Sequence, residues 1–158
     1  MKIVVSAIVV AAATWTAAAR LHMPIDGINP ETLKGGFYDA RTGHPHEAVD
    51  IAAPRNTPVH AVEDGTIAKL FWSKGGGGNT IYEFDPTSTY AYYYAHLERY
   101  ADGLREGQHV TTGQVIGYVG TSGNAPPNAP HLHFAIFELT PAHHWWQGKA
   151  LDPYPFFR

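Results

Sequence analysis

The chain has 158 residues, enough for one domain with a core of its own and too few for two. Hydrophobic residues make up 44% and charged residues 16%, which indicates a globular chain, and the formal net charge of −3 offers no basic surface for nucleic acid. The absence of cysteine excludes disulfides, cysteine-ligated zinc, a thiol nucleophile and a lipoprotein anchor.

Residues 1–19 have the layout of a secretory signal peptide. One lysine precedes an apolar run from Ile3 to about Trp15, and Ala17-Ala18-Ala19 then provides a small-residue cleavage site. The apolar run is shorter than the ~20 residues that a membrane-spanning helix needs. We therefore expect an exported protein of the periplasm or cell envelope, with no stable membrane span after processing. An N-terminal anchor that is not cleaved is the alternative.

Residues 20–42 are polar and rich in turn-forming residues, so we expect a loosely structured lead-in. From residue 43 to 158, short β-branched and aromatic runs alternate with Gly, Pro and Asn every ~8–12 residues. This pattern predicts a mainly β fold with little helix, in which one domain is built on an antiparallel sheet. Asp64-Gly65 indicates a hairpin turn. Residues 75–79 are expected to form a loop between two strands, and residues 97–104 a short helical turn.

Histidine is unusually frequent, with ten His against eleven Lys plus Arg, which hints at metal or acid–base chemistry. The spacing His-x-x-x-Asp occurs three times, at His22/Asp26, His46/Asp50 and His60/Asp64, and His-x-His occurs at His44/His46 and His131/His133. Pro24 interrupts the first His-x-x-x-Asp motif, and a hairpin turn contains the Asp of the third. The middle motif is therefore the strongest.

The segment HLHFAIF, taken as a strand, places His131 and His133 on one face, with Leu132, Phe134 and Ile136 on the other. Two imidazoles at this spacing can share a metal ion, or divide ligand and acid–base roles. Two solvated surface histidines are the simpler interpretation of an isolated His-x-His.

The segment HEAVDIAAP, also taken as a strand, places His46, Ala48 and Asp50 on one face. The small Ala48 leaves space for an ion between His46 and Asp50. These two residues and one histidine of the later strand would form a His₂Asp set, which leaves zinc a fourth position for water. Glu47 would point away, and Pro54 follows too soon for the helix that a HExxH zinc motif requires.

Two further aromatic segments allow two interpretations each. Alternation in YAYYYAHL places His96 on the face of Tyr92 and Tyr94, where it is either a structural or a functional residue. The segment His143-His144-Trp145-Trp146 is either an aromatic clasp that fastens the C-terminal loop, which we favour, or a groove wall that stacks on sugar or peptide.

The segments HEAVDIAAPRNTPVHAVEDGTI, YAHL, EGQHVTTGQVIGYVG and PHLHF resemble, in order and spacing, the lysostaphin/LytM-type zinc metallopeptidases of peptidoglycan. The resemblance runs from about Gly43 to Phe137 and extends to the tail LDPYP. It implies an antiparallel sheet with an open active-site groove walled by loops. The sequence departs from the family pattern at Ala48, where a glycine is usual, and in the loop NAPPNAP.

By the same resemblance, one Zn²⁺ per chain is bound by His46, Asp50 and His133, and His96 and His131 are catalytic residues that do not bind the metal. The implied function is hydrolysis of peptide cross-links in peptidoglycan, by a monomer that acts on stem peptides. The alternative is a non-catalytic module that binds peptidoglycan or regulates a hydrolase. Regulators of that kind usually lack the ligands, whereas this chain has them.

Overall fold

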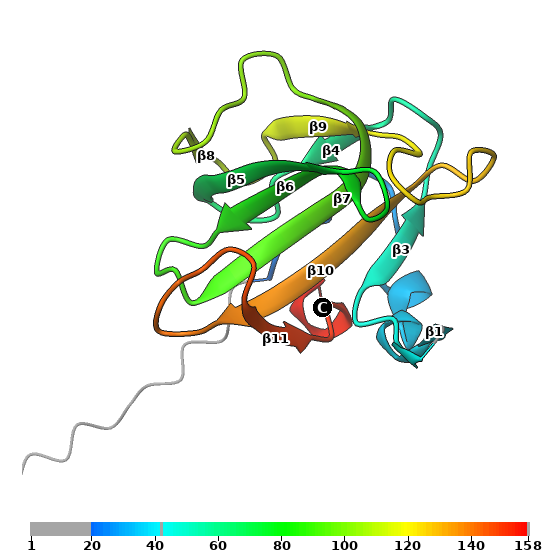
Figure 1. Ribbon diagram of the computed structural model, residues 1–158, viewed down its shortest axis with the longest axis horizontal. Coiled ribbons are helices and arrows are strands. Elements are labelled where there is room, and N and C mark those ends of the chain that lie inside the picture. Colours follow the sequence, from blue (N-terminus) through cyan, green and yellow to red (C-terminus); the bar gives the residue numbers. More distant parts are fainter. Residues whose placement is uncertain (1–19, 42, 158) are drawn as a thin grey trace, which may run out of the picture.

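A computed structural model describes residues 20–41 and 43–157, so the predicted signal peptide lies outside the described residues. Within them, nine strands form one sheet in which every pairing is antiparallel, and the central order is β11-β10-β7-β6-β5-β8 (Figure 1). The strands are β3 (Val49–Ala52), β4 (Pro58–His60), β5 (Gly65–Ser73), β6 (Gly78–Phe84), β7 (Tyr90–Tyr100), β8 (His109–Val110), β9 (Val115–Val119), β10 (His131–Leu139) and β11 (Gly148–Leu151). The mainly β prediction is confirmed.

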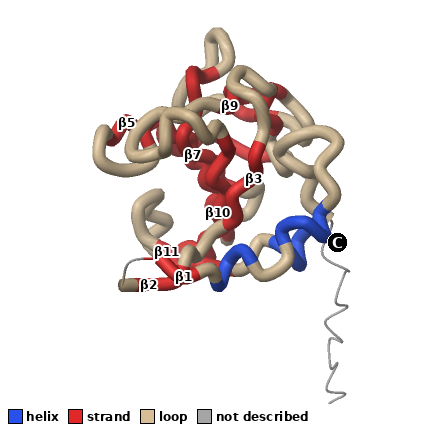
Figure 2. The backbone as a smooth tube through the Cα atoms, turned by 90° about the vertical axis from the view of Figure 1, so that its right-hand side faces the viewer, coloured by secondary structure: helices blue, strands red, loops and turns tan. Residues whose placement is uncertain are grey.

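The remaining elements are short. Strands β1 (Ala40–Arg41) and β2 (His44–Pro45) pair with each other, and the 3-10 helices are η1 (Pro30–Leu33), η2 (Gly36–Tyr38) and η3 (Tyr154–Phe157). Figure 2 shows these helices gathered toward one end of the molecule, near β1 and β11. None of the helices in the described residues has the length and apolar character to cross a membrane.

The two faces of the sheet differ in character because side chains alternate along each strand. One face is the core, where Ile81, Tyr92, Tyr94, Phe134 and Ile136 are at most 2% exposed. The neighbouring side chains of the same strands lie on the opposite face, which is open. This open face carries the candidate site.

The segment before residue 43 is more ordered than its composition suggests. Leu21, Ile25 and Leu33 are buried in the same core as the sheet. The N–H of Leu21 also donates to the carbonyl of Phe156 at 2.9 Å, and the N–H of His60 donates to that of Pro24 at 2.9 Å. The expectation of a loosely structured lead-in is therefore wrong, because three well-spaced apolar side chains anchor it.

Two local predictions also need correction. Residues 97–104 do not start with a helical turn, because β7 continues to Tyr100 and pairs with β9, with Leu97 opposite Val119. Asp64-Gly65 does not join a hairpin, because β4 pairs with β9 whereas β5 pairs with β6 and β8. The loop predicted at residues 75–79 does join two paired strands, although β6 already begins at Gly78.

Candidate active site

Strands β10 and β3 bring two of the predicted residues together on the open face. Their antiparallel register places His133 directly opposite Asp50. Along β10, His131 and His133 remain partly exposed while Leu132 and Phe134 are fully buried, as the alternation predicted. Asp50 reaches the open face in the same way, between buried neighbours.

His46 reaches the site by a route that the sequence did not reveal. The strand begins only at Val49, and Glu47 before it has a left-handed backbone (φ 57°), so the predicted strand over residues 46–50 is wrong in its first part. The N–H of His46 donates to the carbonyl of Asp39 at 2.9 Å, and its Nδ1 donates to the carbonyl of Gly36 at 3.1 Å. Backbone carbonyls of the lead-in thus fix the ring, which is almost fully buried.

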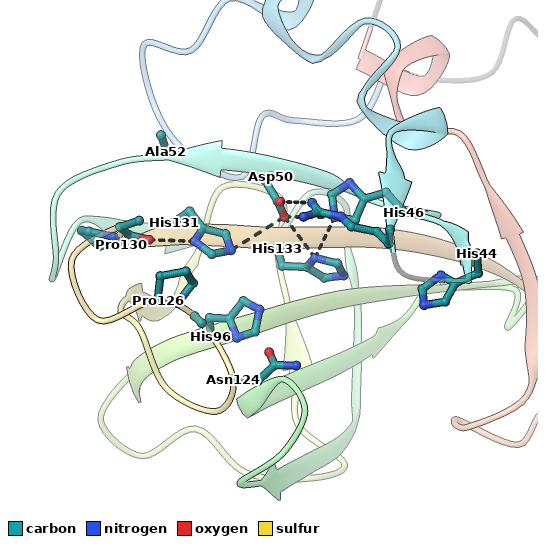
Figure 3. Close-up of a pocket in the computed structure, with 13 residues that line it drawn as sticks. His44, His46, Asp50, Ala52, His96, Asn124, Pro126, Pro130, His131 and His133 are labelled. Atoms are coloured by element: carbon teal, nitrogen blue, oxygen red, sulfur yellow. Dashed lines mark hydrogen bonds and ion pairs between the residues drawn. The ribbon is translucent and has the colours of Figure 1, made fainter.

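The ligand atoms of three residues converge on one point. His46 Nε2 lies 3.2 Å from Asp50 Oδ1, His133 Nδ1 lies 3.0 Å from the same oxygen, and the two nitrogens are 3.2 Å apart (Figure 3). Zinc bound tetrahedrally at 2.0–2.2 Å holds its ligand atoms roughly 3.4 Å apart, close to these separations. These three residues thus form a group of the kind that can hold a metal ion.

The protonation pattern of the cluster also fits a cation. Because the Nδ1 of His46 donates to a carbonyl, the Nε2 of its neutral ring is an acceptor, yet it faces a carboxylate oxygen. Two acceptors at this distance repel each other unless a cation or a proton lies between them. The donor set is therefore suited to a metal ion.

Arg41 holds the second oxygen of the central carboxylate. Its Nη2 lies 2.6 Å from Asp50 Oδ2, whereas the two histidines contact Oδ1. Burial raises the pKa of Asp50, but the hydrogen bond from His133 and the electrostatic interactions with His133 and His46 outweigh burial and hold the pKa well below its ordinary value. The carboxylate is thus ionised and oriented. Sequence reasoning missed Arg41, which lies in a segment that was expected to be loose.

His96 lies on the same face as the cluster, which contradicts the simple alternation of YAYYYAHL. An extra residue in β7, opposite β6, forms a β-bulge between Tyr94 and Leu97, and His96 in it has φ 60°. The bulge is fixed by a 2.7 Å hydrogen bond from the His96 N–H to the carbonyl of Gly77. It turns the imidazole out of the core, as bulges near functional sites often do.

His96 and His131 form a pair beside the metal-ligand cluster. Their ring centroids are 5.0 Å apart, and that of His96 is 5.7 Å from the ring of His133. The Nδ1 atoms of His96 and His131 donate to the carbonyls of Ser122 and Ala129, both at 2.9 Å. In the neutral form of each ring, Nε2 therefore carries no proton, and that of His131 lies 3.8 Å from Asp50 Oδ1. Burial lowers the pKa of His96, which favours the neutral ring.

All five predicted site residues line one cavity of about 780 Å³. Figure 3 shows His131 and His46 on either side of Asp50, with His96 below them toward Asn124. The loop of residues 124–130 forms a wall of this cavity, and His44 on β2 also lines it.

The two rival His-x-x-x-Asp motifs do not form sites of their own. The Nε2 of His60 lies 3.4 Å from Asp26 Oδ2, and so pairs with the aspartate of the other motif. Asp64 instead accepts hydrogen bonds from the N–H and hydroxyl of Thr112, both at 2.8 Å.

Comparisons with known proteins agree with this geometry. The profile of Peptidase family M23 matches residues 44–153. The L-Ala–D-Glu endopeptidase of Bacillus subtilis (strain 168) is 38% identical over 118 residues, which are 72% of this chain and 34% of that protein. Lysostaphin of Staphylococcus simulans is 34% identical over 116 residues, 73% of this chain and 22% of that protein. The chain thus spans about a third or less of these relatives.

Solved structures show the same fold. The catalytic domain of lysostaphin from Staphylococcus simulans aligns with a TM-score of 0.65 and 32% identity, over 81% of this chain and 94% of that one. A zinc-containing peptidase from Vibrio cholerae aligns with a TM-score of 0.67 and 25% identity, over 86% of this chain and 39% of that one.

Proposed function

This chain belongs to peptidase family M23, and on that basis we propose that it is a zinc-dependent endopeptidase that hydrolyses peptide cross-links in bacterial peptidoglycan. The observation that carries the proposal is the convergence of His46 Nε2, Asp50 Oδ1 and His133 Nδ1, with two further imidazoles beside them. Relatives named for endopeptidase activity, and the zinc-containing structural neighbour, support it.

We assign the five residues to two roles. His46, Asp50 and His133 hold one Zn²⁺, which when bound supplies Lewis-acid polarisation of water and of the scissile carbonyl. His96 and His131 each keep Nε2 available, so one of them orients and deprotonates the attacking water and a protonated imidazole donates to the leaving amine.

The bond that we propose is a stem-peptide cross-link, such as that from D-Ala to diaminopimelate. Relatives of this chain are named for different bonds, among them a glycyl-glycine endopeptidase and a DD-endopeptidase. The loop of residues 124–130, which departs from the family pattern, forms a wall of the cavity and is the part that would adapt it to one of them.

We propose that the protein acts as a monomer in the periplasm or cell envelope, after removal of residues 1–19. The apolar run and small-residue site of that segment support export, as does a substrate that lies outside the cytoplasm.

The test is mass spectrometry of the fragments that the purified protein, loaded with zinc, releases from cross-linked peptidoglycan. We expect cross-linked dimers to become monomers, and the masses to identify the bond. His46→Ala is the control, because it removes one ligand, and we expect it to bind less zinc and release nothing. If both proteins sediment with peptidoglycan and leave it intact, the protein is a binding module instead.

A further inference from the structure

A row of aromatic rings leads away from the candidate site across the open face of the sheet. The ring of Tyr93 on β7 lies 6.0 Å from that of His133, and Tyr82 on β6 lies 4.7 Å from Tyr93, between centroids. Trp145 lies 4.8 Å from Tyr82, and Trp146 lies 5.4 Å from Trp145. Tyr93, Tyr82, Trp145 and Trp146 are called the aromatic row below.

The two tryptophans come from the loop that joins β10 to β11, visible in Figure 1 as the orange turn, and they have different environments. Trp145 is half-buried, with its ring 5.4 Å from Phe71 and against Tyr82, so it fastens the loop to the sheet. This is the clasp that the sequence suggested. Trp146 plays no such part, because its side chain remains 62% exposed.

Trp146 is nevertheless held in place. The imidazole of His144 stacks on its indole, with centroids 4.4 Å apart and planes 14° apart, and Trp145 meets it edge-on. An exposed aromatic ring contributes little to the stability of the fold, because little of its apolar area is buried. A large ring fixed in such a position is typical of an interaction surface.

The chemistry of the aromatic row favours a sugar over a peptide. A pyranose ring presents a flat face of C–H groups that matches an exposed indole, and its hydroxyls remain in water. Stem peptides instead carry carboxylates, which are recognised by cationic side chains. The members of the aromatic row carry no charge at neutral pH.

We propose that the aromatic row binds sugar rings of the peptidoglycan glycan strand, with Trp146 as the stacking platform; this rests on the function proposed above. The successive centroid separations from His133 to Trp146 are 6.0, 4.7, 4.8 and 5.4 Å, so these two rings lie at most about 21 Å apart. Roughly six residues of extended peptide span that distance. A stem peptide and its cross-link, attached to a sugar on Trp146, therefore reach the metal-ligand cluster.

The binding test uses the full chain and chitotetraose, an N-acetylglucosamine oligomer that carries no peptide. In NMR titrations we expect the indole N–H signals of Trp145 and Trp146 to shift, and that of Trp72 to stay. Trp146→Ala should weaken binding about tenfold, the loss typical of a removed aromatic anchor, and Trp146→Phe should restore most of it. Trp72→Ala is the matched control, because Trp72 is 55% exposed but follows Phe71 on the opposite face of β5.

Turnover gives an independent measurement. We expect Trp146→Ala to lower the ratio of cleavage of glycan-linked to glycan-free cross-linked peptides, mainly through KM, with unchanged zinc content. Chitotetraose that fails to bind, or that binds Trp146→Ala as tightly as the wild type, would overturn the inference even if the protein cleaves peptidoglycan. Binding that depends on Trp146 in a protein that cleaves nothing would support sugar recognition and refute the proposed enzyme.

Discussion

Glu83 on β6 is a carboxyl group in the core, and replacing it by glutamine should stabilise the protein at neutral and alkaline pH. The side chain is fully buried; Oε2 accepts a hydrogen bond from the hydroxyl of Tyr94 at 2.6 Å, and Oε1 has no partner among the described residues. Burial raises the pKa of Glu83 to about 8, although the hydrogen bond from Tyr94 opposes the rise. The group is therefore protonated in the folded protein at pH 7.

The size of the effect follows from the difference between the folded and unfolded states. The ordinary pKa is 4.5, so the contribution of Glu83 to stability is complete below pH 4.5 and is lost as the pH rises through 8. At about 1.4 kcal/mol per pH unit, the loss is about 3 kcal/mol at pH 7 and about 5 kcal/mol above pH 8. Glu83→Gln has no proton to lose and retains an acceptor for Tyr94, so it escapes this loss.

The assay is urea unfolding at pH 5, 7 and 8.5, in the presence of a chelator so that zinc binding does not contribute to the pH dependence. The difference in free energy of unfolding between Glu83→Gln and the wild type should grow by about 2.5 kcal/mol from pH 5 to pH 7. Glu138→Gln, an exposed change on β10, is the control and should leave the wild-type profile unaltered. Parallel profiles for Glu83→Gln and the wild type would refute the reasoning.

Three further predictions concern the candidate site. Arg41→Met should weaken zinc binding about tenfold in competition with a chelator, because Asp50 loses the partner of its second oxygen; unchanged affinity would assign Arg41 no part in orienting the carboxylate. His96→Ala should lower kcat by about 10²–10⁴-fold while the zinc content measured by mass spectrometry stays at one per chain, whereas loss of zinc would make His96 a ligand. Burial lowers the pKa of both His46 and His96, so activity and zinc occupancy should be constant at neutral pH and fall together below about pH 6, as protons compete for the imidazoles. A rate that stays flat down to pH 5 would contradict that assignment.

The part of the site on β10 was predictable because its signal is local. His131 and His133 alternate with Leu132 and Phe134 along β10. Because one face of the strand is buried, the apolar side chains all point into the core and the two histidines point to the opposite face. The same reasoning correctly placed Asp50. The resemblance to a peptidase family, which the comparisons confirm, then linked these residues to His46 and His96.

The paths by which His46 and His96 reach the site were not predictable, because contacts between distant segments impose them. Glu47 and His96 both have left-handed backbones, which side chains other than glycine rarely adopt. In each case the N–H donates to a carbonyl far along the chain or across the sheet, that of Phe37 for Glu47 and that of Gly77 for His96. Neither HEAVD nor YAHL contains a residue type that indicates such a bend.

The hydrogen bond between Leu21 and Phe156 determines on which face of the molecule a fused or tethered partner lies. It brings the two ends of the described chain together in the layer that covers the core, where Phe157 also packs on Phe134. The cavity of the candidate site lies on the opposite, open face of the sheet. A tag, a fusion partner or a surface tether can be joined at either end of the described chain. It then lies behind the sheet and does not block a polymer that enters the cavity.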